Sequence, residues 1–192
     1  MTNQADPPTP DAEQFAGLFE RYKNLVYKTS YLMLSNAGEA EEATQEVFVL
    51  VYRSLADYDP ARGAFTTWLH RITLNYCLGM KRKRRLPFVD LESQQRQPAA
   101  EPAVEASLAR RSDREAVRLA LEGLSEKQRA VVILRYYHDL PYAEIAEVLK
   151  IPLGTVKSRL DLALRTLRQK LDAKIAGPKV GSLSKDEVTH EL

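Results

Sequence analysis

The chain has 192 residues, of which 44% are hydrophobic and 28% charged, with only 8 glycines and one cysteine. This length allows one ordinary domain or two small ones, and the composition is typical of a soluble, helix-rich protein. No apolar run approaches the roughly 18 residues of a membrane span, and the first ten residues lack the features of a signal peptide. We therefore expect a cytoplasmic protein without membrane insertion. Cys77 alone cannot form an internal disulfide or a multi-cysteine metal site.

The formal net charge of +2 is small, but the cations are clustered. Residues 81–85 are five consecutive basic residues, KRKRR, and residues 155–171 hold five basic side chains against the single carboxylate of Asp161. Two separate basic segments indicate two contacts with a polyanion such as nucleic acid. The alternative that both are merely solvated helix faces stays open on charge alone.

In chain order, the first elements are a leader and two helical patterns. Residues 1–11 hold three prolines and almost no apolar residues, which predicts a disordered leader. Apolar residues recur at helical intervals from Phe15 to Leu34 and predict one helix, or two. Residues 39–55 begin with acidic residues, which suit a helix N-terminus, and become apolar on almost every side. Such a helix is expected in the middle of a bundle.

A break and a third helix complete the first half. Pro60 and Gly63 interrupt the helical pattern. Apolar residues then recur every three or four positions from Phe65 into the basic run at 81–85. Residues 12–85 are therefore predicted to form one small all-helical domain.

The second half is predicted to be a separate helical domain. Residues 86–104 contain three prolines and no helical stripe, so we predict a flexible linker. Four helices are expected in residues 105–174, one of them begun by a capping box of Ser125 and Gln128. Residues 175–192 are predicted to be a flexible tail. The predicted fold is all-α, with two small helical domains joined by the linker.

A helix-turn-helix is predicted within the second half. It needs a short helix, a tight turn and a second helix whose exposed side enters the major groove of DNA. The segment PYAEIAEVLK-IPLG-TVKSRLDLALRTL, residues 141–167, meets each condition. Gly154 is expected to close the turn and Thr155 to cap the second helix. A coiled coil is the alternative, but its apolar 4, 3, 4 spacing lasts barely two heptads.

Two segments resemble regions of bacterial sigma factors of the extracytoplasmic-function (ECF) group, in the sigma-70 family. Residues 124–171, LSEKQRAVVILRYYHDLPYAEIAEVLKIPLGTVKSRLDLALRTLRQKL, resemble region 4. Residues 39–85, EAEEATQEVFVLVYRSLADYDPARGAFTTWLHRITLNYCLGMKRKRR, are similar to region 2. Segments ending in GTVKSR also occur in response regulators, so the specificity comes from finding both regions in this order, joined by a short linker. The resemblance covers residues 12–174.

The resemblance implies an alternative sigma factor, which is not an enzyme. Such a protein binds core RNA polymerase, recognises two promoter DNA elements, helps to melt the DNA and starts transcription. The family is most often held inactive by an anti-sigma factor, so that partner is implied too. The main alternative is a helix-turn-helix regulator that acts without polymerase, which leaves residues 39–85 unexplained. A second alternative is an interaction module for a regulatory partner, which leaves the basic helix unexplained.

Three sets of site residues follow from the resemblance. Aromatic and polar side chains can hold an unstacked base, and cations can contact the phosphates of the DNA strand. The implied core-polymerase residues are Glu41, Glu42, Gln45 and Glu46. The implied minus-10 residues are Tyr58, Thr66, Thr67, Trp68, Arg71, Asn75, Lys81 and Arg82. The implied minus-35 residues are Thr155, Lys157, Ser158, Arg159, Asp161, Leu162 and Arg165.

Asp161 and Leu162 depart from the family pattern, in which a bulky or basic residue is commonly followed by Arg. A carboxylate can only accept, for example from cytosine N4, and Leu can only pack, for example on a thymine methyl. We therefore predict an unusual minus-35 sequence, weaker minus-35 affinity, or both. The three histidines lie in separate segments without partners at ligand spacing, so no metal or other cofactor is expected.

Overall fold

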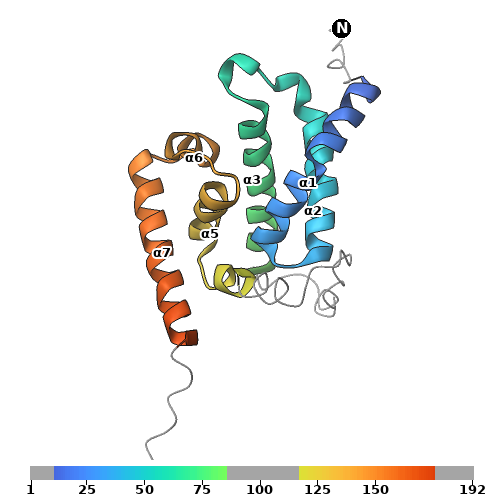
Figure 1. The fold of residues 1–192 in the computed structure, drawn as a ribbon. Coiled ribbons are helices and arrows are strands. Elements are labelled where there is room, and N and C mark those ends of the chain that lie inside the picture. Colours follow the sequence, from blue (N-terminus) through green and yellow to red (C-terminus); the bar gives the residue numbers. More distant parts are fainter. Residues whose placement is uncertain (1–10, 86–116, 176–192) are drawn as a thin grey trace, which may run out of the picture.

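A computed structural model describes residues 11–85 and 117–175, and the side chains up to residues 84 and 170. All regular structure in these two ranges is helical, which confirms the all-α prediction (Figure 1). The helices are α1 (Ala12–Leu34), α2 (Ala37–Ser54), α3 (Phe65–Arg85), α5 (Glu126–Val132), α6 (Tyr142–Leu149) and α7 (Leu153–Ile175). Residues 117–122 are also helical. The predicted leader, linker and tail lie outside the described residues, except for Asp11 and Ile175.

Local polar contacts set where the first helices begin and end. Oδ1 of Asp11 accepts the N–H of Glu13 at 3.2 Å and starts α1 as one continuous helix. Ser35 adopts the left-handed conformation and ends α1, and the next residue, Asn36, caps α2 by accepting the N–H of Glu39 at 3.0 Å. A residue in the left-handed region followed at once by an N-cap makes a tight corner between two antiparallel helices.

The first half is a bundle of α1, α2 and α3 around its own apolar cluster. Its buried members are Val26, Val47, Phe48, Val51 and Leu69. The expectation that α2 is covered on almost all sides is wrong. Three helices leave one face of α2 open, and its residues at 49, 50 and 52 stay exposed. The loop between α2 and α3 holds two short turns, η1 (Leu55–Asp57) and η2 (Pro60–Arg62).

The second half contains the predicted capping box and helix-turn-helix. The hydroxyl of Ser125 accepts the N–H of Gln128, and the Gln128 side chain accepts the N–H of Ser125 at 2.9 Å, which begins α5. α5 continues into the π-helical turn η4 (Ile133–Tyr137). The apolar stripe of α7, including Val156 and Leu160, is buried and packs on α5 and α6. That stripe is covered within the chain, so the coiled-coil alternative has no free seam.

The turn of the helix-turn-helix differs from its prediction. Lys150, with φ of 51° and ψ of 49°, takes the left-handed conformation that ends α6. Gly154 has no positive φ and lies inside α7, which begins at Leu153. The carbonyl of Pro152 accepts the N–H groups of Thr155 and Val156, so Thr155 lies in the first turn and is not the N-cap. The prediction failed because Lys150, not glycine, carries the left-handed conformation here.

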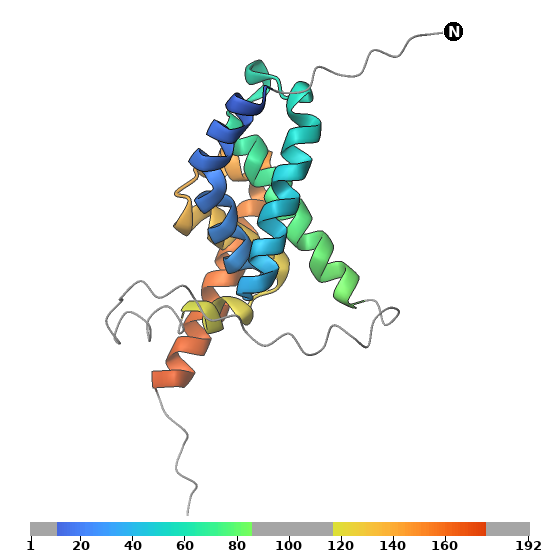
Figure 2. The same cartoon turned by 90° about the vertical axis from the view of Figure 1, so that its right-hand side faces the viewer.

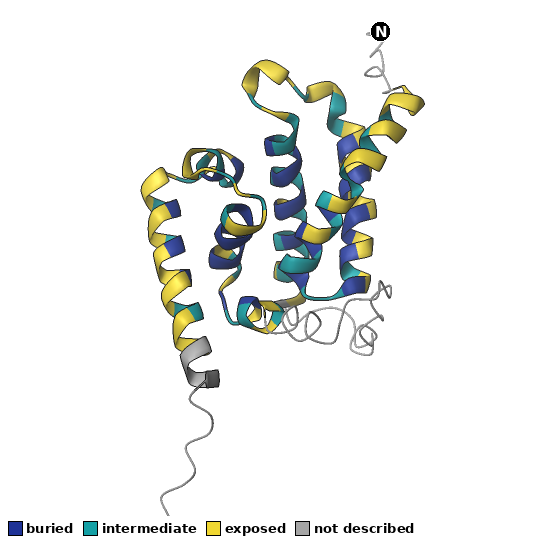
Figure 3. Ribbon diagram, in the orientation of Figure 1, coloured by how far each residue is buried: buried dark blue, intermediate teal, exposed yellow. Residues whose placement is uncertain are grey.

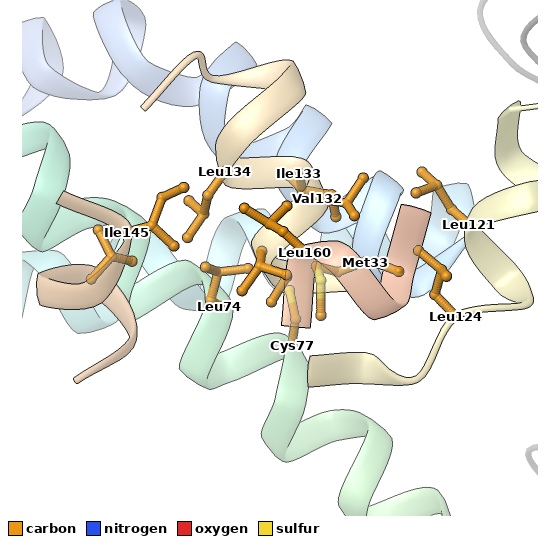
Figure 4. Packing of buried hydrophobic residues seen from close by; sticks show 14 of the residues in the cluster. Met33, Leu74, Cys77, Leu121, Leu124, Val132, Ile133, Leu134, Ile145 and Leu160 are labelled. Atoms are coloured by element: carbon orange, nitrogen blue, oxygen red, sulfur yellow. The ribbon is translucent and has the colours of Figure 1, made fainter. Parts of the chain in front are cut away.

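The two halves pack against each other around a shared apolar cluster (Figures 1 and 2). Met33 of α1 and Leu74 and Cys77 of α3 meet Leu134 and Leu160 of the second half, as Figure 4 shows. The helix α3 also contacts α6, and α1 contacts α5 and η4. The sequence predicted two small helical domains joined by a linker, and in the structure an apolar cluster joins the cores of the two halves.

Candidate nucleic-acid interface

The outward side of α7 forms one exposed surface, which is continuous along the helix in Figure 3. Lys157, Ser158, Asp161, Leu162 and Arg165 are exposed, because they lie opposite the buried stripe. Leu162 keeps 55% of its surface exposed. The remaining two predicted minus-35 residues, at positions 155 and 159, are half-buried. The structure thus brings five of the seven onto one accessible face.

The polar groups of this face interact within the helix. Nη2 of Arg165 lies 2.6 Å from Oδ2 of Asp161, one turn earlier. The hydroxyl of Ser158 donates to the carbonyl of Thr155 at 3.1 Å. Lys157 at the start of the helix has no such contact among those described, so its ammonium group is free to reach a base or a phosphate.

Tyr58, Phe65 and Trp68 form an aromatic cluster at the start of α3. The ring of Tyr58 lies 5.4 Å from the ring centroid of each of the other two. Its hydroxyl donates to the carbonyl of Gly63 at 3.1 Å, across a loop in which Gly63 has φ of 148°. That conformation favours glycine, so the residue lets the loop fold back over the aromatic rings. Tyr58 and Trp68 are both half-buried and present part of their surfaces to solvent.

The other predicted minus-10 residues lie on two sides of α3. Asn75 is exposed and, two helical turns after Trp68, lies on the same side of the helix. Thr67 is buried and Arg71 is directed to the second half, where its Nη2 donates to the carbonyl of Glu147 at 2.8 Å. Thr66 is half-buried. In this conformation only part of the predicted set is therefore accessible from one direction.

The basic run at the end of α3 is divided between solvent and protein contacts. Arg82 and Lys83 are exposed, and Lys81 is half-buried. Arg84 pairs with Glu39 at the start of α2, with 2.8 Å between Nη1 and Oε1. Arg82 and Lys83 are therefore the best-placed groups of this run for a phosphate.

The predicted polymerase-binding residues lie together on the first turns of α2. Glu41, Glu42, Gln45 and Glu46 are all exposed. Burial, and then the charges of Glu46 and Glu42, raise the pKa of Tyr76 on the neighbouring helix α3. The acidic side chains thus act together as a local negative field.

Beyond these acids, α2 exposes apolar side chains that sequence reasoning did not assign to a site. Val49 and Leu50 keep 40% and 38% of their surfaces exposed, and Tyr52 follows them. The signal was present in the sequence as apolar residues outside the buried positions 47, 48 and 51. A second exposed group that was missed is Tyr136 and Tyr137 in η4.

Two histidines that are far apart in the sequence meet at the boundary between the halves. The rings of His70 and His138 are 4.2 Å apart, and Nε2 of His138 lies 2.8 Å from Oγ1 of Thr29. Burial lowers the pKa of His70 to about 4, and burial with the charge of His70 lowers the pKa of His138 to about 3. Both are therefore neutral at pH 7. In the described ranges, no group of three or more His, Cys, Asp or Glu side chains is placed to hold a metal ion.

An exposed, basic helix-turn-helix joined to a second helical bundle defines a helical DNA-binding protein. Family models for Sigma-70 region 2 and Sigma-70, region 4 match residues 18–86 and 114–167. The chain is 32% identical over 170 residues to the ECF RNA polymerase sigma factor SigW of Bacillus subtilis, covering 84% of this chain and 90% of that protein. It is 37% identical over 156 residues to SigE of Mycolicibacterium smegmatis, covering 80% and 60%.

The fold agrees with these sequence relationships. The sigma factor RpoE of Bartonella quintana, solved with the anti-sigma factor NepR, aligns with a TM-score of 0.67 at 22% identity, covering 84% of this chain and 99% of that one. CnrH, solved with the cytosolic domain of CnrY, aligns with a TM-score of 0.64 at 23% identity, covering 85% and 90%. The chain belongs to the sigma-70 family and to its ECF group. It is an alternative sigma factor that directs transcription with RNA polymerase, and it is not an enzyme.

The alternative of a regulator that acts without polymerase is not favoured, because the region 2 model matches residues 18–86 and so accounts for most of the first half. None of the helices described is long and apolar enough to cross a membrane.

Proposed function

We propose that this sigma factor divides its work among three surfaces. The acidic start of α2 binds core RNA polymerase, the aromatic cluster with α3 holds the melted minus-10 element, and the outward face of α7 reads the minus-35 element. The observation that best supports this proposal is the exposed face of α7, because the positions proposed to contact bases lie opposite its buried stripe. Run-off transcription from a cognate promoter should require this chain together with core polymerase. Equal transcript from core polymerase alone would contradict the proposal.

For core binding, the proposal rests on four exposed polar side chains next to the exposed apolar pair Val49 and Leu50. Apolar contacts flanked by charge are typical of specific protein interfaces. Reversing the charge of Glu42 and Glu46 to Lys should weaken binding to core polymerase. Glu13, an exposed acid of α1, offers a matched control whose reversal should leave that affinity unchanged.

For the minus-10 element, the half-buried ring of Tyr58 is proposed to stack on an unpaired base beside Trp68. Asn75, on the Trp68 side of α3, would supply hydrogen bonds to that base, and Arg82 would contact a phosphate. Stacking of a base on an aromatic ring is worth about 1–3 kcal/mol. Tyr58→Ala should therefore reduce binding of a single-stranded minus-10 oligonucleotide by the holoenzyme. Tyr58→Phe, which keeps the ring, should largely preserve it.

For the minus-35 element, Lys157 is proposed to contact bases directly, and Asp161 and Leu162 to shift the preferred sequence. Selection of bound duplexes from a random library would reveal that sequence. Recovery of the element common in the family, at full affinity, would contradict the shift.

We further propose that the protein acts in the cytoplasm and is restrained by an anti-sigma factor. Support comes from the solved relatives, since RpoE of Bartonella quintana was solved with an anti-sigma factor. The apolar side chains of Leu162 and Leu164, 55% and 42% exposed, offer contact area for such a partner. Purification of the tagged chain from its own cells should recover a stoichiometric protein that blocks transcription in the run-off assay. Recovery of core polymerase alone, before and after induction, would argue against that partner.

A further inference from the structure

Each half of the molecule supplies an arginine to a helix end of the other half. Nη1 of Arg129, on α5, donates to the carbonyl of Met33 at 2.8 Å and to Oγ of Ser35 at 3.4 Å, at the C-terminal end of α1. Nη2 of Arg71, on α3, donates to the carbonyl of Glu147 at 2.8 Å, in the last turn of α6. The two contacts run in opposite directions across the same boundary.

The physical reason for both contacts is the same. The last carbonyls of a helix have no partner within it, and they carry the negative end of the helix dipole. A guanidinium placed there donates to a carbonyl at the helix end and also meets favourable charge. Arg129 is only 3% exposed, and its burial lowers the pKa of its side chain. A cation so buried is stable only while its hydrogen bonds are made, so the contact with Met33 depends on the packed halves.

A third polar contact joins the same two halves. The hydroxyl of Thr29 donates to the carbonyl of Leu25 at 2.7 Å, so it accepts from Nε2 of His138 at 2.8 Å. Since a hydroxyl has one proton, this geometry requires the Nε2–H form of a neutral His138. The shared apolar cluster, shown in Figure 4, packs across the same boundary.

We propose that these reciprocal arginine caps lock the free sigma factor in a closed form that competes with minus-10 binding. The apolar cluster brings the halves together, and the arginine contacts select this one arrangement. The guanidinium of Arg71 cannot remain on the Glu147 carbonyl and also follow the DNA strand. Engagement of the minus-10 element with Arg71 included therefore requires opening. The competition, but not the lock itself, rests on the proposed role of Arg71 in DNA binding.

The lock is tested by measuring the distance between the halves in the full-length chain. Donor and acceptor dyes are attached to cysteines at Asn24 of α1 and Gln169 of α7, both exposed. The native Cys77 is fully buried in the packed form, where burial raises the pKa of its thiol to about 11, and it is replaced by Ala in every labelled chain because opening of the shared cluster would expose it. The labelled chain that keeps Arg129 and Thr29 should give mainly high energy-transfer efficiency. Addition of core polymerase should lower that efficiency.

Two variants open the lock without touching the proposed DNA-binding residues. Arg129→Met should lower the ratio of closed to open molecules by about tenfold or more, since hydrogen bonds from charged groups are among the stronger ones. Arg21→Met, at an exposed arginine of α1 that lies over Tyr22, is its control and should change nothing. Thr29→Val leaves the Nε2–H of His138 without an acceptor and should also favour opening. Thr166→Val, which removes a similar hydroxyl contact to Leu162 on α7, is the matched control.

The outcomes separate the lock from the wider proposal. Low transfer efficiency in the starting chain, or unchanged efficiency in both variants, would overturn the lock. If circular dichroism shows that the Arg129→Met variant has lost helix, the energy-transfer efficiency of the Thr29→Val variant is used to test the lock instead. A fluorescent single-stranded oligonucleotide spanning a mapped minus-10 element should bind the opened Arg129→Met chain more tightly, by the factor by which it opens. Opening without tighter binding would overturn the competition and leave the lock standing. Loss of any effect of Tyr58→Ala would instead count against the minus-10 assignment.

Discussion

Oδ2 of Asp161 lies 2.6 Å from Nη2 of Arg165 on the exposed face of α7. The side chains of both residues are mostly exposed, at 62% and 70%, so the pair adds little to stability. The pair directs the guanidinium back along the helix and neutralises one positive charge of the exposed face. If this face contacts DNA as proposed, Asp161 should act on binding through Arg165 as well as through any base it meets.

Replacing Asp161 by Ala should release this guanidinium for a phosphate. We expect tighter binding of a cognate minus-35 duplex and a salt dependence of the affinity that steepens by up to about 0.9 in log–log slope. Fluorescence anisotropy at several salt concentrations measures both. In an Arg165→Ala background the same change should lose most of its effect. An equal gain in both backgrounds would mean that Asp161 acts only by repelling the phosphates.

Lys157 should make the largest single contribution of a basic side chain to the minus-35 complex. If its contact is a bidentate one to a base, Lys157→Ala should cost about 1–3 kcal/mol of binding free energy. Titration of the cognate duplex with the full-length chain measures the loss. Lys127, an exposed lysine in the first turn of α5, gives a control of equal charge. Equal losses in the two variants would remove Lys157 from base reading.

The closed form should weaken in acid because of His70 and His138. Their pKa values, about 4 and about 3 in the packed structure, lie below the ordinary value of 6.5 that each ring regains on opening. The neutral rings face each other, the Thr29 hydroxyl and the ring of Tyr137, so an added proton is disfavoured only when the halves are packed. The lock is thus at full strength above about pH 6.5 and weakens as the pH falls below it.

As the pH falls from 6.5 toward its lowered pKa, each histidine binds a proton only in the open form. This should lower the ratio of closed to open molecules by up to about tenfold per pH unit for each ring. Energy transfer between the dyes at positions 24 and 169, followed from pH 7.5 to 5.5, measures the change. His138→Gln retains a donor for Thr29 and removes one titration, so the dependence should become shallower. A ratio that does not vary over this range would show that opening leaves the histidines buried.

The capping box of α5 should stabilise the second half measurably. Ser125→Ala removes the acceptor of the Gln128 N–H and should lower the free energy of unfolding by about 0.5–2 kcal/mol. Urea denaturation of the full-length chain measures the loss. Ser125→Asp, which keeps an acceptor at the N-cap, should retain most of the stability. An unchanged midpoint for Ser125→Ala would mean that solvent satisfies the end of the helix equally well.

The helices and their order were predictable from the sequence because they depend on short-range chemistry. The capping box links residues three positions apart, and the stripe of α7 repeats every three or four residues. The outward positions of α7 follow from that stripe, so the exposure of Lys157 and Leu162 could be predicted without coordinates. The turn before α7 was harder to predict, because Lys150 adopts a left-handed conformation that glycine is expected to fill.

Only the tertiary structure decided how the two halves meet. Arg71 and Glu147 are 76 residues apart in the chain, and Thr29 and His138 are 109 apart. In the sequence, Arg71 is one more cation on a basic helix, and the histidines are isolated residues. Their partners are helix-end carbonyls and side chains that become neighbours only after two apolar clusters pack. Periodicity reports which face of a helix is buried, but not which helix end an arginine on that face will reach.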